Sequence, residues 1–170
     1  MFTKLIGAIF VMAGSSTCGL TIAAAHKKQV HTLQQLIYLL DYMECELQYH
    51  FTPLPELCRQ VSVEAQGVLR DIFLSLALQL EDHLVQDVSV SMNKILSLHT
   101  QCPSQTVEML QLLGQSIGRF DMAGQLKGLE YIRSECRRKL ELLTKNQDAR
   151  LRSYRTLGLC AGAALCILFI

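Results

Sequence analysis

The stretch VHTLQQLIYLLDYMECEL, residues 30–47, decides the fold. Its apolar residues recur at steps of three and four, as they do on one face of an α-helix, and they are Val30, Leu33, Ile37, Leu40, Met43 and Leu47. The helix should stop near Tyr49 to Phe51, because the corner Thr52-Pro53-Leu54-Pro55 follows. In that corner Thr52 can cap a new helix and Pro53 can take its first position.

The residues before this helix form an apolar run that can cross a membrane. From Leu5 to Ala25 the sequence carries no charge. At about 1.5 Å per residue, a helix of that length spans the roughly 30 Å hydrocarbon core of a bilayer. We therefore predict a transmembrane helix over residues 1–25 that continues into the helix of residues 30–47. A cleaved signal peptide is the alternative, with Ala23-Ala24-Ala25 as its small-residue site.

A second apolar run, TLGLCAGAALCILFI, occupies residues 156–170. It is short for a membrane span, so a buried terminal helix and a re-entrant hairpin are alternatives. Its apolar residues surround the helix axis, which favours lipid over a protein core. With Tyr154 and Arg155 at the boundary, residues 154–170 can just span. The two anchors then bound a domain over residues 26–153.

The charges beside the two runs predict the orientation of the domain. Basic residues follow the first run and precede the second: His26, Lys27 and Lys28, then Arg150, Arg152 and Arg155. Since basic flanks stay on the cytoplasmic side, we expect a cytoplasmic domain with both termini across the membrane and the flanks near anionic lipid headgroups. The seven cysteines include no Cys-x-x-Cys pair and are typical of reduced thiols, which agrees with that side.

The sequence pattern in the middle of the chain predicts a series of helices and no strand. Apolar periodicity predicts helices from Pro53 to about Ala65, Val68 to Leu80, Val85 to Leu98, Val107 to Ile117, and from an N-cap at Asp121 into the second anchor. Gly67 breaks the pattern, and Gly118 can end a helix in the left-handed conformation. We predict an all-α bundle of about six helices between two transmembrane helices. The strongly apolar Val68–Leu80 helix should lie at its centre.

The sequence contains no motif that is typical of an enzyme active site. It contains no phosphate-binding loop, dinucleotide fingerprint, nucleophile elbow or paired-cysteine metal motif. A net charge of +1 gives no field for nucleic acid. We therefore expect a non-enzymatic protein without catalytic residues, cofactor, metal or nucleic-acid partner. A hydrolase or redox enzyme using a cysteine is the alternative, and it requires a thiol of low pKa.

Glycines cluster around one turn, in the run from Leu112 to Gly128. Inside a helix glycine costs about 1 kcal/mol against alanine, so Gly114, Gly124 and Gly128 need a reason. One reason is close packing of helices at a corner. The other is a partner helix that lies against the bared backbone. Small residues also recur every four positions in the anchors, where they favour close contact between transmembrane helices: Ser15, Gly19, Ala23, Gly158 and Gly162.

Together these features resemble the stage III sporulation protein AB family over nearly the whole chain. The resemblance rests on a first span that leads into a Leu-rich helix with an acidic stretch at Leu36 to Glu46, the Thr52-Pro53-Leu54-Pro55 corner, and the closing Leu157-Gly158 span. It also rests on a Gly-x-x-x-Gly-x-x-Asp-x-x-x-Gln signature, which marks candidate partner-binding residues at Gly114, Gly118, Asp121 and Gln125.

The resemblance implies a fold and a function. The family is similar to the cytoplasmic domains of type II secretion F-proteins, which are membrane platforms above a secretion ATPase. It implies a scaffold of the channel between mother cell and forespore in endospore formation, placed in the mother-cell membrane around the forespore. The expected partners are a cytoplasmic ATPase, other membrane subunits of the complex, membrane lipid and further copies of the chain. A membrane-anchored helical adaptor of another secretion or pilus system is the alternative.

Overall fold

A computed structural model describes residues 2–82, 87–118 and 121–169, and their side chains over 25–82, 87–118 and 121–145. Over those residues the chain forms six α-helices and no strand. The helices are α1 (Phe2–Tyr49), α2 (Leu54–Glu64), α3 (Val68–Glu81), α4 (Val88–Leu98), α5 (Ser104–Ser116) and α6 (Met122–Phe169). The prediction of an all-α chain of about six helices is confirmed, and α1 ends where the corner at Thr52 predicted.

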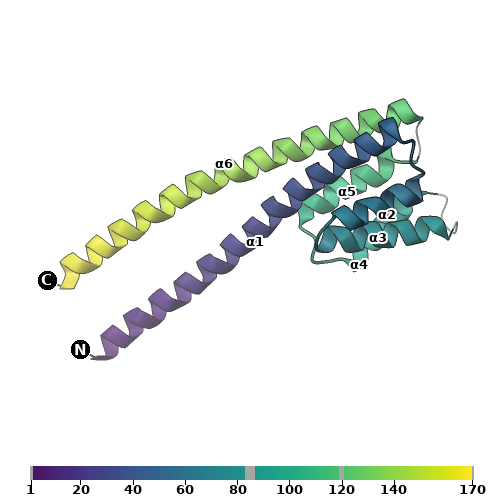
Figure 1. Cartoon of the computed structure of the whole chain (residues 1–170). Coiled ribbons are helices and arrows are strands. Elements are labelled where there is room, and N and C mark those ends of the chain that lie inside the picture. The colour runs from purple at the N-terminus through teal and green to yellow at the C-terminus, as the bar shows by residue number, and fades with distance from the viewer. Residues whose placement is uncertain (1, 83–86, 119–120, 170) are drawn as a thin grey trace.

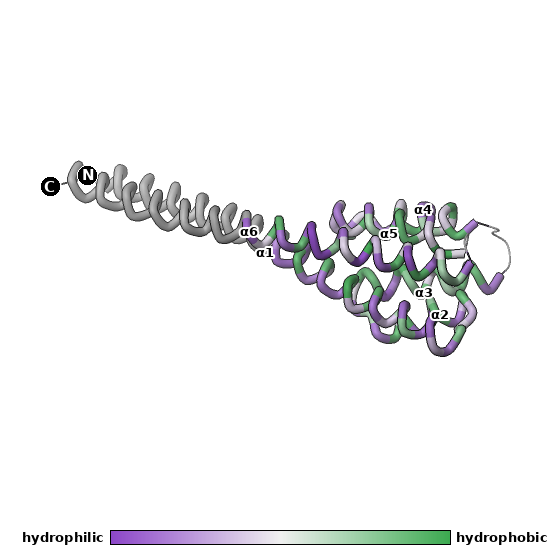
Figure 2. The backbone as a smooth tube through the Cα atoms, turned by 90° about the horizontal axis from the view of Figure 1, so that it is seen from above, coloured by the Kyte–Doolittle hydropathy of each residue, from purple (hydrophilic) through white to green (hydrophobic). Residues whose placement is uncertain are grey.

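Two long helices carry a cluster of four short ones (Figure 1). α1 and α6 run side by side, and α2 and α5 pack against α1. α3 and α4 lie farther from the long pair, where they pack on α2 and α5 respectively and on each other. Viewed from above, the α2–α3 hairpin and the α4–α5 hairpin lie on opposite flanks (Figure 2). Both chain ends extend away from the bundle in one direction. We call the opposite end, where α1 ends and α6 begins, the far end.

One apolar core joins the six helices. α1 gives it most of the face that its periodicity predicted, with Leu33, Leu40 and Met43 almost fully buried. It also buries Leu36 and Leu39, which the predicted register did not include. The other helices contribute large buried side chains, which include Leu57, Phe73, Met92, Leu113 and Ile132. Each such side chain contributes roughly 1.5–3 kcal/mol when it leaves water. Packing of these faces therefore fixes the short helices, which are too short to be stable alone.

The prediction that the Val68–Leu80 helix lies at the centre is wrong. α3 is an outer helix that buries one face, on which Leu69, Ile72 and Phe73 lie. Its opposite face is open, and Leu74 and Leu78 are exposed there. An outer helix needs only one apolar face, so its extra leucines remain in contact with solvent.

The membrane spans stay predictions. In the part of the chain that the structure describes, no helix is long and apolar enough to cross a membrane. Both predicted anchors depend on the side chains of residues 2–24 and 146–169, which lie outside that part. The backbone is helical through both segments, within α1 and α6.

Candidate docking surface at the far end of the bundle

The corner that follows α1 is held by one carboxylate. The Thr52 hydroxyl donates to Glu46 Oε2 at 3.0 Å, and His50 Nδ1 lies 3.2 Å from the same oxygen. Thr52 therefore does not cap α2, and the sequence prediction on this point is wrong. Pro53 holds the N-cap position instead, and its carbonyl accepts the first helical hydrogen bond from Leu57. The Thr52 hydroxyl can reach back to α1 because Glu46 lies in the last turn of that helix, three residues before Tyr49.

Phe51, between α1 and this corner, combines strain with exposure. Its φ is +53°, in the left-handed region that an aromatic residue rarely adopts, and 70% of its surface is exposed. The left-handed conformation costs roughly 1–2 kcal/mol. Because the Phe51 side chain is largely exposed, its burial offsets little of this cost. Tyr49, two residues earlier, is exposed as well. Strain that local packing does not explain points to a functional contact, and nothing in the helical periodicity had singled out Phe51.

The glycine turn lies at the same end of the bundle. A Cβ on Gly114 would lie 2.8 Å from Met92 Cβ, because α4 approaches the backbone of α5 there. Gly118 has φ +84°, as the helix-ending role predicted, and a Cβ on it would lie 3.6 Å from Leu54 Cδ2. The two sequence motifs, the Thr52 corner and the glycine turn, are thus neighbours in space.

α6 begins with the cap that the sequence predicted. The backbone N–H of Gly124 donates to Asp121 Oδ1 at 3.1 Å, and the Asp121 carbonyl accepts from the Gln125 N–H at 2.9 Å. One turn later, a Cβ on Gly128 would lie 2.8 Å from Ser116 Cβ. Close packing of the chain's own helices therefore accounts for Gly114 and Gly128. Binding of a partner at Gly114, Gly118, Asp121 and Gln125 stays a prediction.

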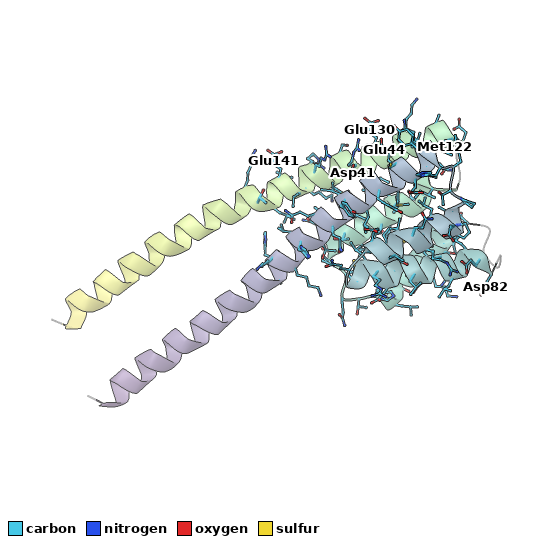
Figure 3. The ribbon with its side chains drawn as sticks, viewed as in Figure 1. Asp41, Glu44, Asp82, Met122, Glu130 and Glu141 are labelled. Carbon is cyan, nitrogen blue, oxygen red and sulfur yellow. The ribbon has the colours of Figure 1, made fainter. Side chains whose placement is uncertain are left out.

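This end of the bundle has a surface to which exposed residues beside the Thr52 corner and in the glycine turn contribute. We call it the far-end surface and define it by Tyr49, Phe51, Gly118 and Asp121, which are all exposed. Figure 3 labels Met122, at the start of α6, and Asp82, at the end of α3, and both lie at this same end. This end of the bundle thus carries two exposed aromatic side chains and exposed carboxylates.

A charge cluster holds α1 against α6 behind this surface. Arg133 Nη1 lies 2.7 Å from Asp41 Oδ1 and 2.6 Å from Glu44 Oε2, and both acidic residues lie on the α6 side of α1 (Figure 3). The hydrogen bond to Asp41 is the main cause that raises the pKa of the Arg133 guanidinium. The acidic stretch of the first long helix therefore has a structural role, which the sequence alone did not reveal.

Comparison with known proteins identifies the family. The family model described as stage III sporulation protein AB matches residues 4–170. The chain belongs to the stage III sporulation protein AB family. Stage III sporulation protein AB of Bacillus subtilis (strain 168) is 22% identical over 170 residues, which cover 98% of this chain and 99% of that protein. A solved structure titled stage III sporulation protein AB has the same fold, with a TM-score of 0.64 and 18% identity over 72% of this chain and 98% of that one.

Membership in the stage III sporulation protein AB family supports a role in sporulation. Of the residues in the Gly-x-x-x-Gly-x-x-Asp-x-x-x-Gln motif, Gly114 lies in α5, whereas Gly118 and Asp121 lie between α5 and α6. The small residues of the predicted anchors fall within α1 and α6: Ser15, Gly19, Ala23, Gly158 and Gly162. Their side chains lie outside the described part, so their contacts stay predictions.

Three buried thiols, those of Cys58, Cys102 and Cys136, do not resemble nucleophiles. Burial raises the pKa of the Cys58 thiol to about 12, and burial is also the main cause that raises the pKa of Cys102 to about 11 and of Cys136 to about 12. A nucleophilic cysteine needs a lowered pKa, so these thiols fit a packing role. In the described part of the chain, no three His, Cys, Asp or Glu side chains are placed to hold a metal ion.

Proposed function

We propose that the chain is a membrane-anchored scaffold of the channel between mother cell and forespore, and that a cytoplasmic ATPase of the secretion type docks on its far-end surface. The likeness of the family to F-protein domains supports the scaffold. The far-end surface supports the docking. There, the Thr52 corner and the glycine turn are neighbours, and a strained and exposed Phe51 directly precedes the corner, at the end of the bundle opposite to the direction of both chain ends.

In this proposal the apolar ends anchor the chain in the mother-cell membrane around the forespore. The bundle lies in the cytoplasm and both termini lie across the membrane, as the basic flanks favour. The small residues of the anchors would contact other membrane subunits or further copies of the chain. Because both long helices leave the bundle in one direction, a single membrane can hold both ends while the far end points into the cytoplasm.

The far-end surface has the chemistry of a transient protein interface. Exposed aromatic side chains such as Tyr49 and Phe51 are frequent sources of binding energy when a partner covers them. Asp82 and Asp121 add exposed negative charge at the same end. We therefore expect the ATPase to present a patch that is apolar at its centre and basic at its rim. Binding to that patch would favour the orientation that the strained left-handed backbone gives to the Phe51 side chain.

Binding of the purified ATPase to the full chain in anionic vesicles tests the docking. Phe51→Ala should weaken binding at least tenfold, because truncation of a central aromatic side chain typically costs 2 kcal/mol or more. Val63→Ala is the matched control, since Val63 is 78% exposed and lies at the other end of α2 from the corner. It should leave binding within about twofold. Equal losses for both variants, or none for Phe51→Ala, would refute docking at the far end.

Sporulation tests the biological role. A strain that lacks the gene should fail in spore development after engulfment, and the wild-type gene should restore it. The Phe51→Ala gene should restore it poorly although the protein accumulates in the membrane. Normal sporulation of the deletion strain would refute the scaffold proposal.

A further inference from the structure

The end of the bundle nearest the chain ends has a surface of its own. Two loops lie there, residues 65–67 between α2 and α3 and residues 99–103 between α4 and α5. They border an open hollow whose wall also includes Lys28 of α1. Leu98, on the same wall, has 74% of its surface exposed. We call Lys28, Gly67, Leu98 and His99 the near-end surface.

The position of Lys28 gives the depth of this surface relative to the predicted membrane. Lys28 stands three residues after Ala25, where the first uncharged run ends. At about 1.5 Å per residue, it lies within roughly 5 Å of the end of that run along the helix axis. The headgroup region of a bilayer is of the same order of thickness. If residues 5–25 span the bilayer, a surface that lines one hollow with Lys28 lies at headgroup level.

The charged residues at the near and far ends of the bundle agree with a near end that lies at the membrane. The near-end loops, residues 65–67 and 99–103, contain no Asp or Glu, although the exposed Glu64 directly precedes the first of them. The loops at the far end contain Asp82, Asp87 and Asp121 beside one arginine, Arg119. Lys27 is exposed beside Lys28. Asp71 is the acidic residue on the wall of the same hollow, and it partly offsets the lysines there. An anionic membrane therefore attracts the near end through its lysines, whereas the far end has no comparable cluster of basic residues.

We propose that the near-end surface rests on the anionic lipid headgroups of the membrane that holds the anchors. Leu98 enters the headgroup region as an apolar contact, while Lys27 and Lys28 pair with lipid phosphates. The proposal rests on the membrane anchoring of the proposed function. It adds a third point of attachment beside the two anchors, so the bundle cannot tilt freely about α1 and α6. The far-end surface is thereby held away from the membrane.

Tryptophan fluorescence can test this contact, because the chain contains no Trp. The full chain with Leu98→Trp is reconstituted into vesicles of phosphatidylglycerol and phosphatidylcholine, with brominated acyl chains as quenchers. Val90→Trp is the matched control, since Val90 is exposed near the other end of the same helix α4. Flotation of the vesicles on a density gradient reports separately whether the chain is anchored.

The expected result is clear quenching and a blue-shifted spectrum for Leu98→Trp and neither for Val90→Trp. Lys28→Gln, or an increase of salt from 50 to 500 mM, should lower the quenching of Leu98→Trp, because each lysine adds about fivefold to the affinity for an anionic surface. Quenching of Leu98→Trp that is as weak as that of Val90→Trp, in a chain that floats with the vesicles, would overturn this proposal alone. Quenching of Leu98→Trp that neither salt nor Lys28→Gln lowers would overturn the assignment to anionic headgroups. A chain that does not float would overturn the anchoring and this proposal together.

Discussion

The contact between α4 and α5 at Gly114 yields a sharp prediction on stability. A Cβ at position 114 would lie 2.8 Å from Met92 Cβ, 3.2 Å from Met92 Cγ and 3.4 Å from Ser89 Cα. Two of these atoms, the Met92 Cβ and the Ser89 Cα, are fixed by the backbone of α4, so rotation of a side chain cannot make room. Since carbon atoms prefer about 3.5–4.0 Å, α4 itself must move away.

Two opposing effects set the size of the change in Gly114→Ala. Overpacking of a core costs roughly 1–3 kcal/mol, and replacement of glycine by alanine inside a helix returns about 1 kcal/mol. We therefore expect a net loss of about 1 kcal/mol in the free energy of unfolding. Gly114→Val adds two methyl groups to the same contact and recovers less helix propensity. Its loss should be on the order of 3 kcal/mol.

Urea unfolding of the full chain in detergent, followed by circular dichroism, measures these losses. The control is Gln115→Ala, the exposed neighbour, which should change stability by less than about 0.5 kcal/mol. A Gly114→Val protein that unfolds at the same urea concentration as this control would refute the close approach of α4. Gly114 would then be explained by a partner helix, which is the other reading of the glycine turn.

Three further predictions concern the cap, the charge cluster and the thiols. Asp121→Ala should destabilise the start of α6 by about 1 kcal/mol by loss of the bond to Gly124, whereas Asp121→Asn should be nearly neutral, as hydrogen exchange of the first turn can show. Arg133→Met should cost about 1–2 kcal/mol in thermal unfolding, because it leaves two close carboxylates without their cation. Since the folded pKa of Cys58 is about 12 against an ordinary 9.0, the unfolded chain loses the thiol proton first. The Cys58 thiol alone should therefore lower stability by up to about 1.4 kcal/mol per pH unit from pH 9 to about 12, and Cys58→Ala should remove this contribution. At pH 8 the exposed Cys45 should react with iodoacetamide well before the buried Cys58.

The sequence predicted those features that depend on local patterns. The buried face of α1, the end of α1 near Tyr49 and the cap at Asp121 each follow from a few neighbouring residues. The left-handed conformation at Gly118 followed from glycine itself. By the same rule a bulky residue such as Phe51 is not expected to adopt it.

Features that depend on distant residues could not be predicted in this way. Arg133 meets Asp41 and Glu44 across 92 and 89 positions of sequence, and no local pattern pairs them. The number of leucines in α3 suggested a central helix, yet which face is covered depends on how the two hairpins are arranged. For Gly114, the sequence left a choice between internal packing and a partner, and only the position of Met92 on α4 favours the former.

The two ends of the bundle differ in a way that suits a scaffold between a membrane and a soluble partner. α1 and α6 reach from the far end to the chain ends, and Arg133 joins them between those points. A partner that displaced Phe51, just beyond the end of α1, would also act on α6 through this charge cluster. Because the charged hydrogen bonds at Arg133 are partly buried, they resist sliding of one helix along the other more than the more exposed pair that Arg137 forms with Asp41. Docking at the far end should therefore shift α1 and α6 together rather than one past the other.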